Sequence, residues 1–301
     1  MPDTPPIDLR QLDAVAVDAV LRRLAHRASP PWLHAEVARR MAERLQIIRL
    51  QPARIVDWWS FLGASAEVLS QAYPDAHRIL VEPSAALAQL SRDAERTPWW
   101  SPKRWRKESV EVKLESDDLG EPAQLLWANM MLHQVKDPPR LISRWQNAIA
   151  ADGFVMFSCL GPGTLRELRA TYASAGWPDP TTAFVDMHDL GDMLVHAGFA
   201  DPVMDQETIT LSWATPQAML DELRSLGGNT APGRFQALRT PRWRARLEQE
   251  LEALAAPDGR IAMRFEVAYG HAFKAMPKVQ AGQPTMVSLD EMRSLVRTRR
   301  R

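Results

Sequence analysis

The chain of 301 residues has one cysteine, only 14 glycines and no excess of either charge. The single cysteine, Cys159, excludes an intramolecular disulfide and a multi-cysteine metal site, and its apolar neighbours predict a small buried side chain rather than a nucleophile. No group of His, Asp and Glu has the spacing of metal ligands, so we predict no metal. Lys+Arg and Asp+Glu number 37 each, and this balance gives no overall field that would favour nucleic acid or an anionic membrane.

Long apolar runs are also absent. None approaches the roughly 20 residues that a membrane-spanning helix needs, so we predict no membrane span. Residues 1–6 are rich in proline and lack the charged and then apolar pattern of a secretion signal. We therefore expect a cytoplasmic protein.

Glycine is scarce where a cofactor-binding fold would need it most. Residues 54–57 predict a short strand that ends at Asp57, and residues 64–72 have the apolar spacing of a helix. In a doubly wound α/β sheet, the turn between the first strand and its helix approaches a nucleotide-like cofactor closely, which normally requires glycine. In this cofactor turn, residues 57–63, only Gly63 is present. Trp59 and Phe61 stand where the first two glycines of a Gly-x-Gly-x-Gly turn would lie.

The rest of the first half alternates strands with helices. Residues 78–83 predict a second strand ending in an acid, Glu82, roughly twenty residues after the turn, where an acid typically binds ribose hydroxyls. Three more apolar runs predict strands at residues 110–114, 123–130 and 154–160. Because helical segments separate them, we expect a mostly parallel sheet with helices on both faces. A last strand over residues 260–268 is expected to run antiparallel beside its neighbour.

The chain is predicted to have three parts. Residues 1–50 contain two amphipathic helices, separated by Pro30 and Pro31, and form an N-terminal helical cover. Residues 51–275 form the main α/β domain, and residues 276–301 a basic tail.

Residues 96–107 combine three tryptophans with four basic residues. Such a segment can be a loop whose tryptophans pack on the domain, a surface that docks an acidic protein, or a site for single-stranded nucleic acid. The balanced charge of the chain favours packing, then protein docking, and places nucleic acid last.

Several segments in the second half carry a family resemblance: residues 157–169, 184–194, 197–205, 221–224, 227–229 and 265–272. They resemble the S-adenosylmethionine-dependent malonyl-acyl-carrier-protein O-methyltransferases of biotin synthesis. The resemblance implies a class I methyltransferase fold, which is Rossmann-like, with S-adenosylmethionine as cofactor. It also implies methylation of the free carboxylate of a malonyl thioester, with acyl carrier protein as a partner. The same segments are similar to a mitochondrial complex I assembly factor described as an arginine hydroxylase.

The resemblance also assigns residues. It matches four positions to cofactor binding: Asp57, Gly63, Glu82 and Asn129. His133, just after the fourth strand, and Arg166 and Arg169, just after the fifth, are candidates for substrate binding, although such residues are more often structural or surface residues. Arg27 stands where the family has an active-site tyrosine, so no catalytic residue is assigned.

Two functions therefore stay open. The first is an S-adenosylmethionine-dependent methyltransferase, which the retained acids Asp57 and Glu82 favour. The alternative is a catalytically silent binding or assembly protein that has lost the cofactor, which the bulky Trp59 favours. A nicotinamide oxidoreductase is a weak third, since the Gly-x-Gly-x-x-Gly turn is absent.

Overall fold

A computed structural model describes residues 12–27, 29–95 and 110–275. The tryptophan-rich segment at 96–107 and the basic tail at 276–301 lie outside the described residues, so the predictions for them stay untested. Within the described ranges, no helix is both long enough and apolar enough to cross a bilayer.

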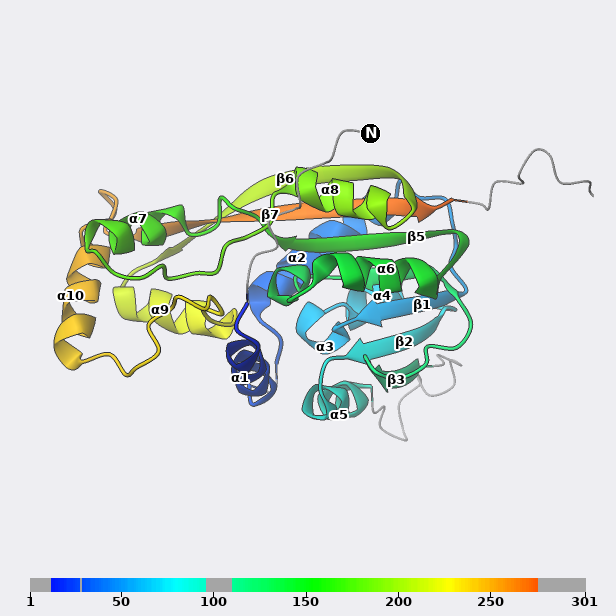
Figure 1. The fold of residues 1–301 in the computed structure, drawn as a ribbon, viewed down its shortest axis with the longest axis horizontal. Coiled ribbons are helices and arrows are strands. Elements are labelled where there is room, and N and C mark those ends of the chain that lie inside the picture. Colours follow the sequence, from blue (N-terminus) through cyan, green and yellow to red (C-terminus); the bar gives the residue numbers. More distant parts are fainter. Residues whose placement is uncertain (1–11, 28, 96–109, 276–301) are drawn as a thin grey trace, which may run out of the picture.

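One mixed sheet organises the molecule (Figure 1). Its strand order is β3-β2-β1-β4-β5-β7-β6, in which β1 to β5 pair in parallel and β7 pairs antiparallel with both β5 and β6. The strands are β1 Arg54–Trp58, β2 His77–Glu82, β3 Val110–Leu114, β4 Ala123–Ala128, β5 Ile149–Leu160, β6 Phe199–Trp213 and β7 Ile261–Lys274. The parallel order and the antiparallel last strand confirm the predicted α/β fold.

The described helices connect and cover these strands. They are α1 Ala14–Ala25, α2 Trp32–Leu45, α3 Ser60–Gly63, α4 Ala66–Ala72, α5 Ala85–Ala94, α6 Pro138–Ala148, α7 Arg166–Ser174, α8 Met187–His196, α9 Pro216–Ser225 and α10 Pro241–Glu252, with a 3₁₀ turn at Leu132–Gln134. The predicted helix over residues 32–50 ends earlier, at Leu45. Helix α10 was not predicted, because only Leu247 and Leu251 bury apolar side chains on an otherwise polar segment.

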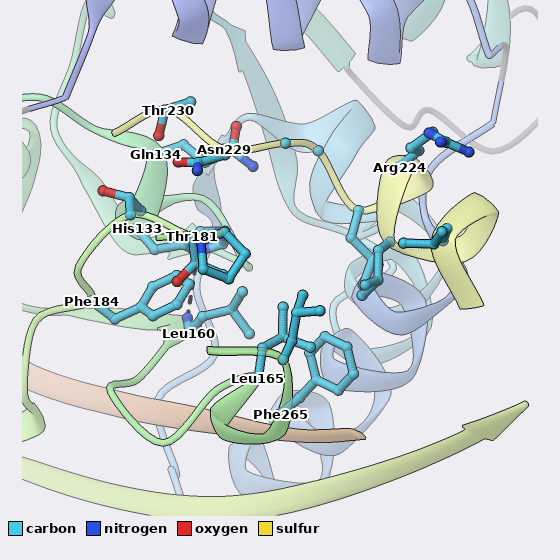
Figure 2. Close-up of a pocket in the computed structure, with 18 of the residues that line it drawn as sticks. His133, Gln134, Leu160, Leu165, Thr181, Phe184, Arg224, Asn229, Thr230 and Phe265 are labelled. Atoms are coloured by element: carbon cyan, nitrogen blue, oxygen red, sulfur yellow. Dashed lines mark hydrogen bonds between the residues drawn. The ribbon is translucent and has the colours of Figure 1, made fainter. Parts of the chain in front are cut away.

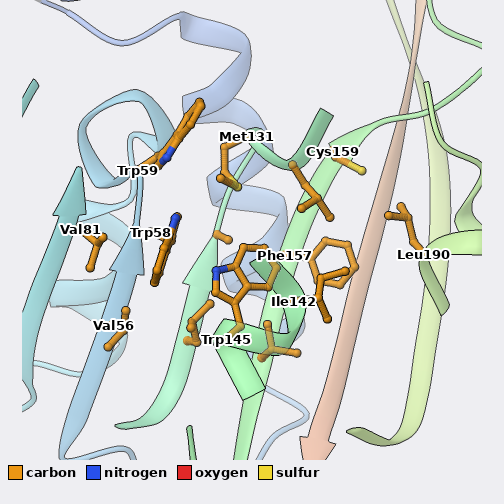
Figure 3. Packing of buried hydrophobic residues seen from close by; sticks show 14 of the residues in the cluster. Val56, Trp58, Trp59, Val81, Met131, Ile142, Trp145, Phe157, Cys159 and Leu190 are labelled. Carbon is orange, nitrogen blue, oxygen red and sulfur yellow. The ribbon is translucent and has the colours of Figure 1, made fainter. Parts of the chain in front are cut away.

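Helices cover both faces of the sheet, because strand side chains alternate between the faces. Leu126 and Ala128 of β4 pack into one core with α1, α5, α6 and α8 (Figure 3), whereas Leu125 and Trp127 pack into the other with α2, α4, α7, α9 and α10. Cys159 is 2% exposed in the first core, which confirms its prediction as a small buried side chain. The carboxyl ends of the parallel strands point toward α1 and α9 (Figure 1), and the candidate site lies at this edge.

Candidate active site

The cofactor turn keeps a glycine-like backbone although its first glycine position is a tryptophan. Trp59 has φ 56° and ψ 48°, in the left-handed region that glycine adopts freely. This conformation costs a residue with a side chain about 1–2 kcal/mol. The Trp59 N–H donates to the Val81 carbonyl at 2.7 Å, and its carbonyl accepts from the Gly63 N–H at 2.8 Å. The sharp turn is therefore held by its hydrogen bonds despite the indole.

The Trp59 indole fills space at the edge of the sheet. Its side chain is almost fully buried, and its Nε1 donates to Glu115 Oε1 at 2.7 Å, an oxygen that also accepts from Trp58 Nε1 at 2.8 Å. Glu115 directly follows β3, and β2 lies between β1 and β3. The hydrogen bond from Trp59 to Glu115 therefore spans the carboxyl end of β2, where the Glu115 N–H also donates to the Glu82 carbonyl at 3.1 Å. Figure 3 shows Trp58 beside Val81 of β2 and the Trp59 ring beyond the carboxyl ends of the strands.

Two buried acids lie at the carboxyl ends of β1 and β2. Glu82 ends β2 with no exposed surface, and its Oε1 accepts from the Phe61 N–H at 2.8 Å and from Ser91 Oγ at 2.6 Å. Among the described residues, its Oε2 has no hydrogen-bond partner. Asp57 is equally buried and accepts from Ser60 Oγ at 2.5 Å. Burial raises the pKa of Glu82 to about 8 and that of Asp57 to about 6.

Asn129 ties the turn to the rest of the fold. Its Nδ2 donates to the carbonyls of Gly63 at 2.6 Å and His34 at 2.8 Å, and its Oδ1 accepts from Ser158 Oγ at 2.6 Å. Both donors of the amide are thus used inside the protein. Gly63 itself is closely packed, since a Cβ there would lie 2.9 Å from Ser65 Oγ. The contact of Asn129 and Gly63 with a cofactor stays a prediction.

A cavity of about 270 Å³ opens on the other side of the same sheet edge (Figure 2). Its wall combines apolar residues from β5, α7, α9 and β7 with polar residues from the loops after β4 and α9. The lining residues are Arg23, His133, Gln134, Leu160, Leu165, Leu168, Tyr172, Pro180, Thr181, Thr182, Phe184, Leu220, Leu223, Arg224, Leu226, Gly227, Gly228, Asn229, Thr230 and Phe265.

One end of the cavity is polar, and two side-chain oxygens there lack hydrogen-bond partners among the described residues. Gln134 is 8% exposed, and neither its Oε1 nor Thr181 Oγ1 has a hydrogen-bond partner among the described residues. Figure 2 shows both side chains close to His133, whose Nδ1 accepts from the Leu160 N–H at 3.4 Å. Because buried polar atoms are normally paired, Gln134 and Thr181 point to a ligand with hydrogen-bonding groups.

Arginines stand where the cavity meets solvent. Arg23 and Arg224 both line it and are exposed, and Arg23 donates to the Gly227 carbonyl. Partial burial, together with the charges of Arg224 and Arg27, lowers the pKa of Arg23. Arg224 pairs with Asp221, whereas Arg23 and Arg27 form no ion pair with any described residue. The opening is therefore positively charged and suited to an anionic group.

The structure brings together some of the predicted residues. Asp57, Gly63, Glu82 and Asn129 gather around the cofactor turn, and His133 lies in the cavity wall. Arg166 and Arg169 do not line the cavity; instead their helix contributes Leu168, with Leu165 just before it. Arg166 is exposed, and the Arg169 guanidinium bonds to the Pro162 carbonyl. A substrate role for either arginine stays a prediction.

Sequence reasoning predicted only His133 among the residues that line the cavity. The polar residues that it missed include Arg23, Gln134, Thr181 and Arg224. Gln134 adjoins His133, so the prediction of a substrate-binding residue just after the fourth strand could have included it. Arg224 lies in the family-like segment 221–224, but its exposure on a helix gave no reason to choose it. Nothing in the local pattern distinguishes Thr181, because its position depends on the loop between α7 and α8.

Glu82 is expected to make the stability of the protein depend on pH. Its folded pKa is about 8 against an ordinary 4.5, so between these values the folded state holds a proton that the unfolded state has lost. Stability should then fall as pH rises from 4.5 to 8, by up to roughly 1.4 kcal/mol per pH unit, and level off above 8. Asp57 adds a fall of the same sign up to about pH 6.

The substitution Glu82→Gln should flatten this dependence above pH 6, because a neutral amide replaces the titrating group. Urea unfolding at a series of pH values measures the effect. The exposed Glu121→Gln is the control, and equal slopes for Glu82→Gln and the wild-type protein would contradict the prediction.

Comparison with solved structures and known proteins defines the class. The structure superposes on a putative methyltransferase from Bacillus halodurans with a TM-score of 0.53 and 12% identity, covering 78% of this chain and 99% of that one. It superposes on the YcgJ protein of Bacillus subtilis with a TM-score of 0.52 and 9% identity, covering 79% and 98% of the two chains. The fold is that of the class I methyltransferases.

Sequence similarity defines the family. The chain is 37% identical over 251 residues to a malonyl-[acyl-carrier protein] O-methyltransferase of Gallionella capsiferriformans, covering 82% of this chain and 86% of that protein. It is also 37% identical over 243 residues to the protein of the same name from Halorhodospira halophila, covering 80% and 81%. No family model matches the chain. The chain belongs to the malonyl-[acyl-carrier protein] O-methyltransferase family, and the resemblance seen in its sequence is confirmed.

The cofactor turn can be tested against the S-adenosylmethionine that this family implies. The unpartnered Glu82 Oε2 fits a ribose hydroxyl, and the backbone of the turn fits a closely approaching ligand. The Trp59 indole does not fit, because its hydrogen bond to Glu115 spans the end of β2 and the Glu82 carboxylate there has no exposed surface. In this conformation the residues present therefore do not accommodate the cofactor.

Proposed function

We propose that this chain transfers a methyl group to the free carboxylate of a malonyl thioester carried by acyl carrier protein, with S-adenosylmethionine as donor. Membership of the family supports the reaction and the partner. Biotin synthesis, the pathway implied by the resemblance, is part of the same proposal. We further propose Asp57, Gly63, Glu82 and Asn129 as the cofactor side of the site and residues 1–50 as its helical cover.

The observation that carries this proposal is the composition of the cavity. A malonyl thioester on its carrier arm combines a carboxylate, carbonyl oxygens, amide N–H groups and apolar methylenes. The apolar wall fits the methylenes, Gln134 Oε1 can accept from an amide N–H, and the Thr181 hydroxyl can donate to a carbonyl. Exposed arginines at the opening fit the acidic surface and phosphate of the carrier.

The chemistry places few demands on catalytic side chains. A malonyl carboxylate is already ionised at neutral pH, so it needs no general base to act as a nucleophile. The protein has to align the acceptor and exclude water from it. Leu160, Leu165 and Phe265 provide this apolar enclosure in the cavity. The absence of an assigned acid or base is therefore consistent with the proposed reaction.

Intact-mass spectrometry of acyl carrier protein tests the proposal. After incubation with the chain and S-adenosylmethionine, the malonyl carrier should gain the mass of one methylene. An esterase should then hydrolyse the methyl ester and return the carrier to its original mass. Acetyl carrier protein, which lacks the free carboxylate, is the control and should stay unchanged. No mass gain from either the wild-type protein or a variant that demonstrably binds S-adenosylhomocysteine would contradict the proposal.

A further inference from the structure

We infer that the Trp59 indole occupies the place of the cofactor's adenosine, and that the cofactor binds only when this side chain leaves Glu115. The inference concerns this chain's own cofactor turn and goes beyond the proposed function, because it does not depend on the identity of the methyl acceptor.

The sheet order provides the first argument. Trp59 follows β1, and its hydrogen-bond acceptor Glu115 follows β3. Since β2 lies between these strands and the Glu115 N–H donates to the Glu82 carbonyl at 3.1 Å, the bond between the indole and Glu115 spans the end of β2 beside Glu82. Glu82, the acid at that end, has no exposed surface. A ribose cannot reach the buried Glu82 carboxylate unless this contact between Trp59 and Glu115 opens.

The closed arrangement is also well anchored. Glu115 accepts both indole N–H groups on one oxygen, and its backbone carbonyl accepts from the Arg144 guanidinium. That guanidinium also lies 4.9 Å from the Trp58 ring centroid, and Trp58 packs edge-on against Trp145 at 6.2 Å. Because Glu115 is also held by Arg144 of α6, the Trp59 indole has a rigid hydrogen-bond acceptor that keeps it in place.

The turn itself does not require a tryptophan. Trp59 adopts the left-handed backbone that glycine tolerates best, and the turn is held by main-chain bonds to Val81 and Gly63. The hydrogen bond from Phe61 to Glu82 also comes from the main-chain N–H and not from a side chain. Removal of the indole should therefore leave the backbone of the turn in place and open the space above Glu82.

Isothermal titration of the full chain with S-adenosylhomocysteine tests the inference. Trp59→Gly should bind at least about tenfold more tightly than the wild-type protein, a difference of about 1.4 kcal/mol. Trp213→Gly is the control, because it removes an indole at the end of β6, on the sheet edge opposite β3, and leaves the Trp59 indole and its bond to Glu115 in place. Its affinity should equal that of the wild-type protein.

A second variant and an NMR measurement make the test independent of any effect of glycine on the turn. Trp59→Ala should show the same gain if glycine loosens the turn. In wild-type protein with ¹⁵N-labelled tryptophan, the Trp59 indole N–H resonance, assigned by its loss in Trp59→Phe, should shift when S-adenosylhomocysteine binds. The inference is overturned if neither Trp59 variant binds more tightly than wild type, or if ligand binds and the Trp59 resonance does not move. A Trp59→Gly protein that binds ligand but methylates no malonyl carrier would contradict the proposed function alone.

Discussion

The substitution Leu223→Trp fills the cavity and is expected to lower kcat/KM for malonyl carrier protein by about 100-fold. Losing the contacts of one substrate group costs a few kcal/mol, and about 1.4 kcal/mol corresponds to a tenfold change. Leu223 lines the cavity of about 270 Å³, and an indole at this position would occupy much of that volume. The cofactor turn lies outside the lining residues, so affinity for S-adenosylhomocysteine should not change. Steady-state methyl transfer and calorimetric binding measure the two quantities.

Leu238→Trp is the control for this substitution, because Leu238 is 95% exposed and does not line the cavity. It adds the same side chain without filling the proposed acceptor site, so its kinetics should match those of the wild-type protein. An unchanged kcat/KM in the Leu223→Trp protein would mean that the acceptor binds elsewhere.

Asn129→Ala is expected to destabilise the fold by about 3–5 kcal/mol. The substitution leaves the carbonyls of His34 and Gly63 and the hydroxyl of Ser158 without their buried partner. Each such group costs about 1–3 kcal/mol when it remains unsatisfied. The free energy of unfolding from urea denaturation, monitored by circular dichroism, measures the loss.

Asn147→Ala is the control for Asn129. Asn147 is exposed on α6, where water can solvate its amide. We expect a change below about 1 kcal/mol. A similarly small change for Asn129→Ala would contradict the structural role of that amide in holding the turn to β5 and α2.

The sequence predicted the strands well because each is a short apolar run with clear boundaries. β3 has the predicted limits, and β2 and β4 differ by only a few residues. Strands β5 and β7 extend further than predicted, because pairing continues beyond their apolar runs: Ile149 of β5 pairs with Ala123, and Lys274 of β7 pairs with Phe199. Helix α10 shows the opposite case, in which two buried leucines determine a helix that composition does not reveal.

The cofactor side of the site was also open to prediction. Asp57 and Glu82 follow adjacent parallel strands, and the carboxyl ends of such strands meet at one edge of the sheet. The sequence shows that Trp59 replaces the first glycine of the cofactor turn, but it does not show what the indole contacts. Only the fold shows that the indole reaches Glu115, because this contact joins two strand ends that are separated by 56 positions in the chain.

The sequence alone determined the α/β fold, the order of its elements and the family, because these depend on local periodicity and on segments of matching residues. The tertiary structure decided the cavity, which joins α1, the end of β4, the loop before α8 and the end of α9. The tertiary structure also decided how deeply Asp57 and Glu82 are buried and how their pKa values shift. Burial and hydrogen bonding are properties of the folded surroundings, so the raised pKa of Glu82 and the closed turn above it have no signal in the residues taken one by one.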